Sequence, residues 1–167
     1  MAFSIIPPIS SNAQSTSRYH IAVCDWMILK RQKLGEFELA RKIEADGVEM
    51  DMGSLGKRIM FDNQLRDSVQ AAKFKHYADS FNIKVASIAM SGFFAQSFIT
   101  RDNYEELIKD GINTARYFNS KVIFLPLGGC GDNWQNNECY RKELIKRLRI
   151  IGGMARDNGL VIGIRTS

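Results

Sequence analysis

The chain ends with LVIGIRTS, residues 160–167, directly after the turn sequence RDNG. A run of Leu, Val, Ile, Gly and Ile is typical of a strand that is buried on both faces of a parallel sheet. Such a strand normally leads into a loop and a covering helix, for which no residues follow. We therefore expect either the last strand of a complete five-stranded fold or the fifth strand of a larger one.

Four similar apolar stretches precede this one. They cover residues 20–26, 47–52, 84–90 and 121–127, and each is too short for a helix and is bounded by turn residues. The segments between them have the apolar spacing of amphipathic helices. Strands that alternate with helices at this spacing pair in parallel through right-handed crossovers, so the sequence predicts an α/β fold.

The clearest helix is predicted within residues 102–119. Asp102 and Glu105 are three residues apart, as an N-cap residue and its capping-box partner should be. One stripe holds its apolar residues Tyr104, Leu107, Ile108, Ile112 and Ala115.

Three further helices follow the same pattern. In residues 138–159 the helix is expected to end with Gly159 at the C′ position. Its inward stripe is Tyr140, Leu144, Leu148, Ile151 and Ala155, and its exposed face is predicted to carry Arg141, Lys142, Lys146, Arg147 and Arg149. The two earlier helices are marked by Phe37 and Ala40, and by Phe74, Tyr77, Ala78 and Phe81.

Two α/β architectures fit five strands. One is a five-stranded doubly wound, flavodoxin-like sheet, and the other is a partial (β/α)8 barrel made of the first five βα units. The doubly wound sheet should have a phosphate-binding glycine turn or an acidic cluster after its first strand, where the chain has only Asp25. A barrel should have polar residues within its strands. The predicted strands contain four such residues, Glu49, Asp51, Ser87 and Arg165. These residues favour the barrel.

Composition limits the classes of partner. With 167 residues, 45% hydrophobic and 25% charged, the chain has the material of one globular domain. The net charge of +5 comes from basic residues that are interleaved with acidic ones and form no tail, which indicates a solvated surface and no nucleic-acid partner. No apolar run is long enough to span a membrane, so we expect no membrane partner.

The first 17 residues are set apart from the predicted domain at 18–167. Ser11-Asn12-Ala13 before Gln14 is the small-x-small pattern that a signal peptidase reads, but no basic residue precedes the apolar run. Residues 1–17 are therefore either a disordered arm or the remnant of an export signal. If they are the remnant of an export signal, we expect a periplasmic or exported protein, and otherwise a cytoplasmic one. Cys130 and Cys139 could pair only if the protein is exported.

Four stretches together resemble one known family. They are ARKIEADGVEMDMGS at 40–54, FNIKVASIAMSGFF at 81–94, GINTARYFNSKVIFLPLGG at 111–129 and NGLVIGIRTS at 158–167. In this order they are similar to the xylose-isomerase-like TIM barrels, a family of sugar phosphate isomerases and epimerases. The resemblance implies that residues 18–167 form an incomplete barrel, because a whole barrel of this kind has roughly 250 residues.

The resemblance also implies a chemistry. Enzymes of this family move a proton between adjacent carbons of a sugar, commonly with a divalent metal and two glutamates. Their metal ligands begin with a glutamate on the fifth strand, where this chain has Arg165, and a guanidinium cannot bind a metal. We therefore expect no metal site in this chain, which alone should be inactive, whereas a full-length parent could use a divalent metal.

Five residues are the candidates for substrate binding. Glu49 matches the family's glycine–aliphatic–glutamate pattern, where that residue lines the sugar pocket, and Asp51 shares its face. Arg165 could hold an anionic group of a substrate or could balance Glu49 or Asp51 in an ion pair. Trp26 and Phe93, or its neighbour Phe94, could form an apolar wall against a sugar, or could belong to the core.

The predicted function is a sugar or sugar phosphate isomerase or epimerase, and the alternative is a non-catalytic carbohydrate-binding barrel. Action on nucleic acid, known for other barrels of this type, is disfavoured because it needs a cluster of metal-binding histidines and the chain has two. The expected ligand is a small sugar or sugar phosphate. The unpaired edges of the first and fifth strands should also cause the chain to self-associate.

Overall fold

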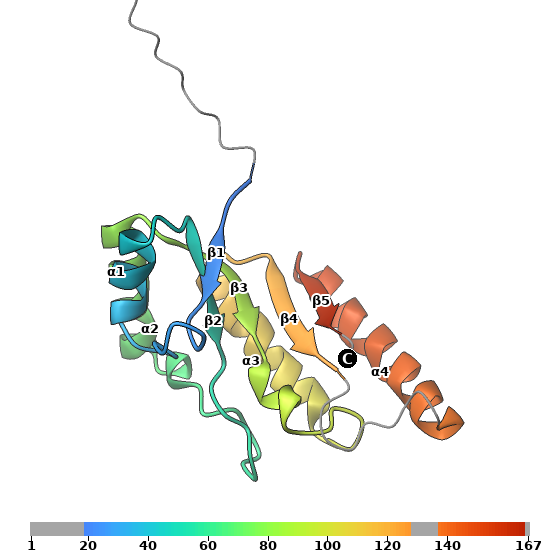
Figure 1. Ribbon diagram of the computed structural model, residues 1–167. Coiled ribbons are helices and arrows are strands. Elements are labelled where there is room, and N and C mark those ends of the chain that lie inside the picture. The colour runs from blue at the N-terminus through green and yellow to red at the C-terminus, as the bar shows by residue number, and fades with distance from the viewer. Residues whose placement is uncertain (1–18, 128–136, 166–167) are drawn as a thin grey trace, which may run out of the picture.

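The strands form one open parallel sheet. The computed structural model describes residues 19–127 and 137–165. In these ranges the strand order is β1-β2-β3-β4-β5, with every neighbouring pair parallel (Figure 1). The strands are β1 Ala22–Cys24, β2 Gly47–Asp51, β3 Lys84–Ala89, β4 Val122–Pro126 and β5 Val161–Arg165. The predicted arm at residues 1–17 and the proposed partner Cys130 lie outside the described residues.

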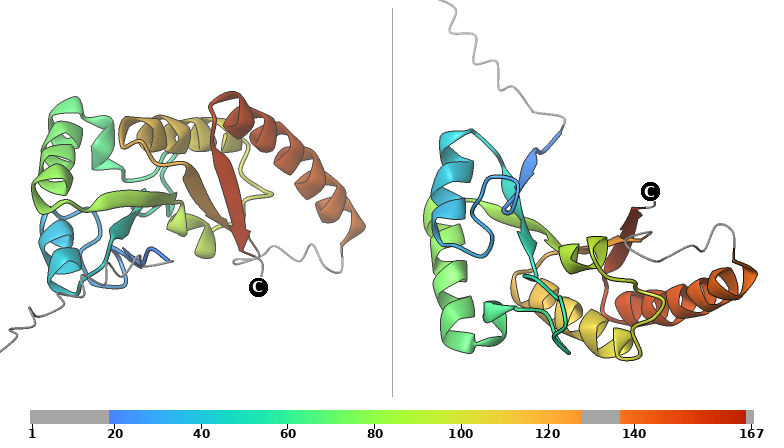
Figure 2. Two further views of the ribbon diagram at one scale, coloured as in Figure 1. Left: turned by 90° about the horizontal axis from the view of Figure 1, so that it is seen from above. Right: turned by 60° about the horizontal axis from the view of Figure 1, so that its bottom comes forward.

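Four α-helices lie on one side of this sheet. They are α1 Gly35–Lys42, α2 Ser68–Phe81, α3 Tyr104–Tyr117 and α4 Glu138–Asp157, with two short 3-10 helices, η1 Gln64–Arg66 and η2 Ser91–Phe94. Figure 2 shows the helices as an arc around the curved sheet, whose other face stays open. None of the helices in the described ranges is both long and apolar enough to cross a membrane.

The strand order decides between the two predicted architectures. In a doubly wound sheet the order reverses at a switch point, and helices cover both faces. Here the order follows the chain without reversal and the helices stay on one face, as in a (β/α)8 barrel. The predicted partial barrel is therefore confirmed, and the flavodoxin-like alternative is wrong.

The core lies between the sheet and the helices. In β2, Val48 and Met50 are fully buried on the helix side, so Glu49 and Asp51 belong to the opposite, concave face. The predicted stripe of α3 is buried throughout. In α2, Phe74 is buried as predicted, but Tyr77 is exposed.

The C-terminal end of α4 was predicted correctly, whereas the N-terminal end of α3 was not. Gly159 takes the C′ position of α4 with φ of +67°, and its N–H donates to Arg156 O at 2.9 Å. The predicted N-cap of α3 is wrong, because Asn103 occupies that position and not Asp102. The Asn103 side chain donates instead to Ile59 O at 2.7 Å, which ties α3 to the loop after β2.

Arg147 was predicted on the exposed face of α4, and this is wrong. Its guanidinium is buried, with Nη1 3.0 Å from Phe98 O and 2.6 Å from Arg101 O. Nε donates to Glu143 at 2.7 Å, and the group lies 4.4 Å above the Tyr104 ring. The loop that supplies these carbonyls comes from elsewhere in the chain, so helical spacing alone could not show it.

Candidate functional site

A polar row crosses the concave face of three neighbouring strands. Cys24, Glu49 and Ser87 are register partners on β1, β2 and β3. The Cys24 thiol donates to Glu49 Oε1 at 3.1 Å, and the Ser87 hydroxyl donates to Oε2 at 2.5 Å. Burial, and then the Glu49 carboxylate, raises the pKa of Cys24 to about 12, so the thiol keeps its proton and acts as a donor. Glu49 is therefore held in one orientation from both sides.

Asp51 lies one pleat further along β2, at the end where barrel enzymes place their sites. Its Oδ1 accepts the backbone N–H of Ser91 at 3.1 Å, and Arg31 Nε lies 2.7 Å from Oδ2 without the alignment of a hydrogen bond. Burial raises the pKa of Asp51, while Ser91 and Arg31 act in the other direction. The Arg31 side chain is 43% exposed, so its charge also faces solvent at this rim.

Arg165 and an aromatic pair occupy the other side of the same rim. The guanidinium carbon of Arg165 lies 5.5 Å from the centre of the Phe94 ring, and that ring lies 6.0 Å from Phe124 on β4. Within the described residues, Arg165 forms no ion pair with Glu49 or Asp51, whose partners are those named above. Arg165 is exposed at the end of β5, and its role stays a prediction.

The short helix η2 joins the two sides of the rim. Ser91 at its start contacts Arg31, whose Nη2 lies 3.4 Å from Oγ, and Phe94 at its end contacts Arg165. Gly92 lets this turn lie close to the β2 loop, because a Cβ there would be 2.8 Å from Leu55 and Phe61 side-chain atoms.

Phe93 and its neighbour Phe94, the alternatives for one part of the predicted aromatic wall, lie in different surroundings. The Phe93 ring is fully buried between Phe61 and Phe98, with ring centres 5.5 and 5.3 Å away, so it belongs to the core. Phe94, which is 41% exposed, is the aromatic side chain that faces solvent at this turn. Trp26 is partly buried in the turn after β1.

Sequence reasoning missed a buried hydrogen-bond network behind the rim. Asp25 Oδ2 accepts the backbone N–H groups of Gln32 at 2.9 Å and Asp51 at 3.2 Å. The Gln32 amide donates to Asp51 O at 2.7 Å and to Asn63 Oδ1 at 2.8 Å. The signal was the dense polar sequence after the first strand, where Asp25, Arg31, Gln32 and Glu36 are close together. We call Asp25, Gln32, Glu36, Asp51 and Asn63 the rim network.

The donor atoms of the rim do not fit a divalent metal. No group of three or more His, Cys, Asp or Glu side chains in the described ranges is arranged to hold one. Glu49 already accepts two hydrogen bonds, Asp51 faces Arg31, and the guanidinium of Arg165 stands at the end of β5. These groups therefore act as hydrogen-bond and ion-pair partners and not as metal ligands.

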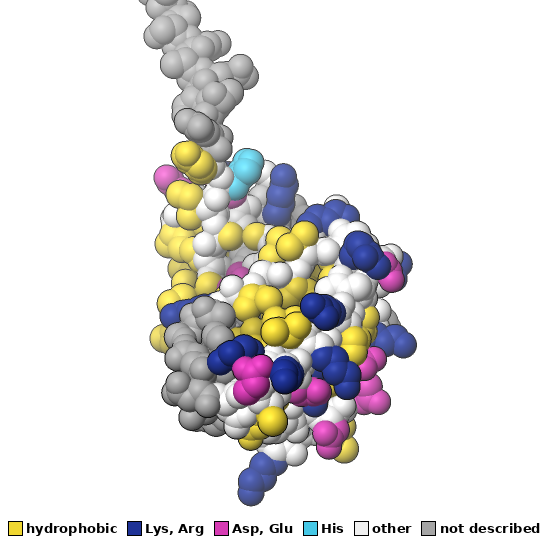
Figure 3. Space-filling model, turned by 90° about the vertical axis from the view of Figure 1, so that its right-hand side faces the viewer, with side chains coloured by type: hydrophobic (Ala, Val, Ile, Leu, Met, Phe, Trp, Pro, Cys, Tyr) yellow, Lys and Arg dark blue, Asp and Glu magenta, His cyan; other side chains and the backbone are white. Residues whose placement is uncertain are grey.

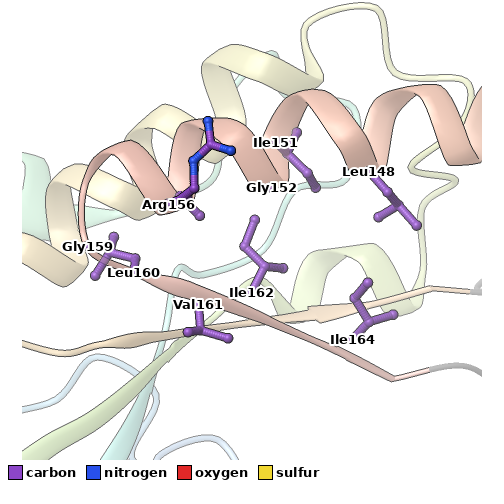
Figure 4. A pocket seen from close by; sticks show the side chains of 10 residues that line it. Leu148, Ile151, Gly152, Arg156, Gly159, Leu160, Val161, Ile162 and Ile164 are labelled. Carbon is purple, nitrogen blue, oxygen red and sulfur yellow. The ribbon is translucent and has the colours of Figure 1, made fainter.

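Two hollows in the surface of the described residues lie away from this rim. A cavity of about 500 Å³ opens between α4 and β5, where Leu148 and Ile151 face Ile162 and Ile164 (Figure 4). Figure 3 shows hydrophobic side chains gathered on that side of the molecule, with charged groups around them. A wider hollow of about 1180 Å³ lies at the N-terminal ends of the strands, next to His20 and Lys121. That end of a barrel usually serves stability, so we place the site at the rim.

Comparisons with known proteins agree with the topology. A sequence model described as xylose isomerase-like TIM barrel matches residues 37–167. Among solved structures, a probable 3-DHS dehydratase from Bacillus anthracis superposes with a TM-score of 0.65 at 12% identity, covering 87% of this chain and 52% of that one. No curated protein matches the chain.

Two further structures give the same result. A xylose isomerase-like TIM barrel protein from Mycobacterium smegmatis, in complex with magnesium, has a TM-score of 0.63 at 16% identity and covers 88% of this chain and 55% of that one. A sugar phosphate isomerase/epimerase from Parabacteroides distasonis has a TM-score of 0.63 at 12% identity, with 92% and 53% covered. At these identities the likeness establishes the fold, and this chain spans about half the length of each.

Proposed function

Because the chain belongs to the xylose isomerase-like TIM barrel family, we propose that it provides the sugar-binding half of a sugar isomerase or epimerase. The observation that carries the proposal is Glu49, an acidic side chain on the concave face that two donors hold in place. A relative with the same fold is described as a sugar phosphate isomerase/epimerase, which favours sugars as the ligand class. The chain alone is expected to bind a sugar without converting it.

The rim has groups suited to this ligand class. Removal of a proton beside a carbonyl group places negative charge on the oxygen, so it needs a base and a cation nearby. In the proposal, Glu49 accepts either a hydrogen bond from a sugar hydroxyl or the proton from the carbon beside the carbonyl group, on the concave face. Arg165 binds an anionic group of the substrate, and the exposed Phe94 ring packs against the apolar face of a sugar.

A titration of the isotope-labelled chain with xylose, glucose and glucose 6-phosphate tests the proposal. We expect backbone amide shifts at Glu49, Ser87 and Phe94, and weaker binding of all three sugars by Glu49→Gln. Glu38→Gln, on the exposed face of α1, is the matched control and should bind as the wild type does. Shifts confined to the helices, or no shifts with any sugar, would contradict the proposal.

Arg165→Ala separates anionic from neutral ligands. This variant should weaken the binding of glucose 6-phosphate by about 1.5–3 kcal/mol, the contribution of a charge-assisted hydrogen bond. The affinity for glucose should not change. The melting temperature should change little because the side chain is exposed and has no ion pair in the described part of the chain. If the variant binds glucose 6-phosphate and glucose with the same affinities as the wild type, Arg165 does not belong to the site.

The second candidate is a non-catalytic carbohydrate-binding barrel. Arg165 favours it, because the resemblance places a metal-binding glutamate at this position. Incubation with a bound aldose or ketose in deuterated water tests the purely binding role. Deuterium on the carbon beside the carbonyl group would exclude that role, whereas binding without deuterium is expected of this chain under both functions.

A further inference from the structure

Two carboxyl groups are completely buried behind the rim. Asp25 follows β1 and Glu36 lies in the first turn of α1, and neither side chain has any exposed surface. Three of their four oxygens, Asp25 Oδ1 and both oxygens of Glu36, have no hydrogen-bond donor among the described residues. A buried Glu36 carboxylate without any donor, in addition to the buried carboxylate of Asp25, would be strongly destabilising, so the arrangement needs a further explanation.

A single shared proton provides one. Besides burial, the charge of Asp25 and a side-chain hydrogen bond with Asp25 are both among the causes that raise the pKa of Glu36, so the two carboxyl groups are neighbours, and two carboxylates could not form that bond because neither can donate. If Glu36 carries a proton, its O–H donates to Asp25 Oδ1. We propose that Asp25 and Glu36 share one proton, and that this buried pair positions the loop after β1 so that Arg31 meets Asp51 at the rim.

The hydrogen bonds of Asp25 show how the pair would act on the loop. Its other oxygen, Oδ2, accepts N–H groups from Gln32 at one end of the loop and from Asp51 on β2. The backbone O of Asp25 also accepts the N–H of Lys30 at 2.7 Å. A charged, correctly oriented Asp25 therefore joins the loop to the strand, and Glu36 keeps it in that orientation.

The loop needs such a support because its backbone is strained. Leu29 and Gln32 have φ of +57° and +44°, values that side-chain-bearing residues rarely adopt, and they flank Arg31 closely. Residues in this region keep such conformations only when their surroundings determine them. Arg31 contacts Asp51 and Ser91 only while the loop keeps this shape.

The electrostatics agree with a proton on Glu36. Burial, and then the charge of Asp25, raises the pKa of Glu36 to about 9, against the smaller effect of the Lys33 backbone amide. Burial raises the pKa of Asp25 to about 6, while the N–H groups of Gln32, Asp51 and Trp26 lower it. Among the described residues, the other titratable or charged groups near the pair are Asp51 with its partner Arg31, and the Cys24 thiol, whose pKa the charge of Asp25 helps to raise. At neutral pH Glu36 is therefore the acid and Asp25 the carboxylate.

This proposal does not depend on sugar binding, because neither buried carboxyl group reaches the concave surface. Its test is a carbon-13 NMR titration of the side-chain carboxyl groups in the full chain. We expect the Glu36 carboxyl carbon to have the chemical shift of a protonated acid at pH 7 and to titrate near pH 9. A Glu36 signal already typical of a carboxylate at pH 6 would overturn the proposal.

Conservative and disruptive variants test the positioning role. Glu36→Gln keeps a donor for Asp25 Oδ1, so the amide signals of Gln32 and Asp51 should stay in place and should no longer shift between pH 7 and 10. Glu36→Ala should displace both signals at every pH, and the exposed Glu38→Gln should reproduce the wild-type titration. Equal displacement by Glu36→Gln and Glu36→Ala would contradict the proposal. If Glu36→Gln fails to fold, the carbon-13 titration of the wild type still tests whether Glu36 carries the proton.

Discussion

The rim network and the edge at β5 are built in opposite ways. In the rim network, polar side chains from the loops after β1 and before η1 are buried and hydrogen-bonded to one another and to the backbone of Asp51 on β2. At the edge, β5 and α4 expose aliphatic groups around a cavity, with Val161 64% and Ile164 46% exposed. The network is closed by residues of this chain alone, whereas the apolar edge is a surface that water solvates poorly. Stability should therefore depend on the first region and association on the second.

The largest expected effect is on pH dependence, and it comes from the rim network. The folded pKa of Glu36 is about 9, above its ordinary value, so the folded state keeps a proton that the unfolded state loses. The stabilisation is complete at low pH and is lost as pH rises from about 4.5 to 9, on the order of 6 kcal/mol at about 1.4 kcal/mol per pH unit. Asp25, with a pKa of about 6, adds a loss in the same direction between about pH 4 and 6.

Urea denaturation of the wild type and of Glu36→Gln at pH 5, 7 and 9 measures this effect. The wild type should become less stable at each step, and the variant should lose less stability than the wild type. A wild type that gains stability from pH 5 to 9 would show that exposed carboxylates, and not this pair, dominate.

The next effect compares two neighbours in η2. Phe93→Ala should cost about 3–5 kcal/mol of unfolding free energy, because it leaves a cavity between the rings of Phe61 and Phe98. Phe94→Ala should cost less than about 1 kcal/mol because that ring is 41% exposed. Denaturant unfolding of both variants checks the difference. Similar costs would mean that η2 does not separate core from rim as described.

Removal of the charge at Arg31 should have a smaller effect. Arg31→Met leaves the buried carboxylate of Asp51 without its cation, although Ser91 N–H still donates to it. We expect a loss of about 1–3 kcal/mol, less than for a fully buried pair because the Arg31 side chain is 43% exposed. Arg58→Met, at an exposed ion pair, is the control and should be close to neutral. Unfolding experiments in which both variants behave alike would show that Asp51 does not need Arg31.

The smallest effect on stability, but a clear one on association, is expected at the β5 edge. Val161→Lys should change the unfolding free energy by less than about 0.5 kcal/mol and should reduce self-association, because a charge on an edge strand opposes pairing. Sedimentation velocity measures this, with Ile145→Lys on α4 as the control for a lysine away from the strand edge. A wild-type chain that is a monodisperse monomer would contradict the expected self-association.

The outcome of the sequence predictions follows from how local each signal is. The strands, the helices and the division of β2 into Val48 and Met50 on one face and Glu49 and Asp51 on the other were predictable, because periodicity is carried by consecutive residues. The N-cap at Asn103 and the burial of Arg147 were not predicted. Both depend on carbonyl groups in loops that are distant in sequence, at Ile59, Phe98 and Arg101.

The candidate site divides in the same way. Glu49, Asp51 and Arg165 could be named from their places in the strands, although their role in binding stays a prediction. The ion pair of Arg31 with Asp51 could not be foreseen, because the Arg31 loop has two residues with positive φ and no glycine to reveal its shape. Phe93 and Phe94 are adjacent, and only the direction of η2 shows that the second faces solvent.

The sequence by itself therefore determined the order of the elements, the inward faces of the strands and most helices, and the resemblance to a barrel family. Tertiary structure alone decided that the strand order never reverses, that Asp25 and Glu36 are both buried, and that β5 has an exposed apolar edge. The reason is physical, because hydrophobic periodicity indicates which side of a helix or strand is buried. The partner of a buried charge depends on loop paths that bring distant residues within a few ångströms of each other.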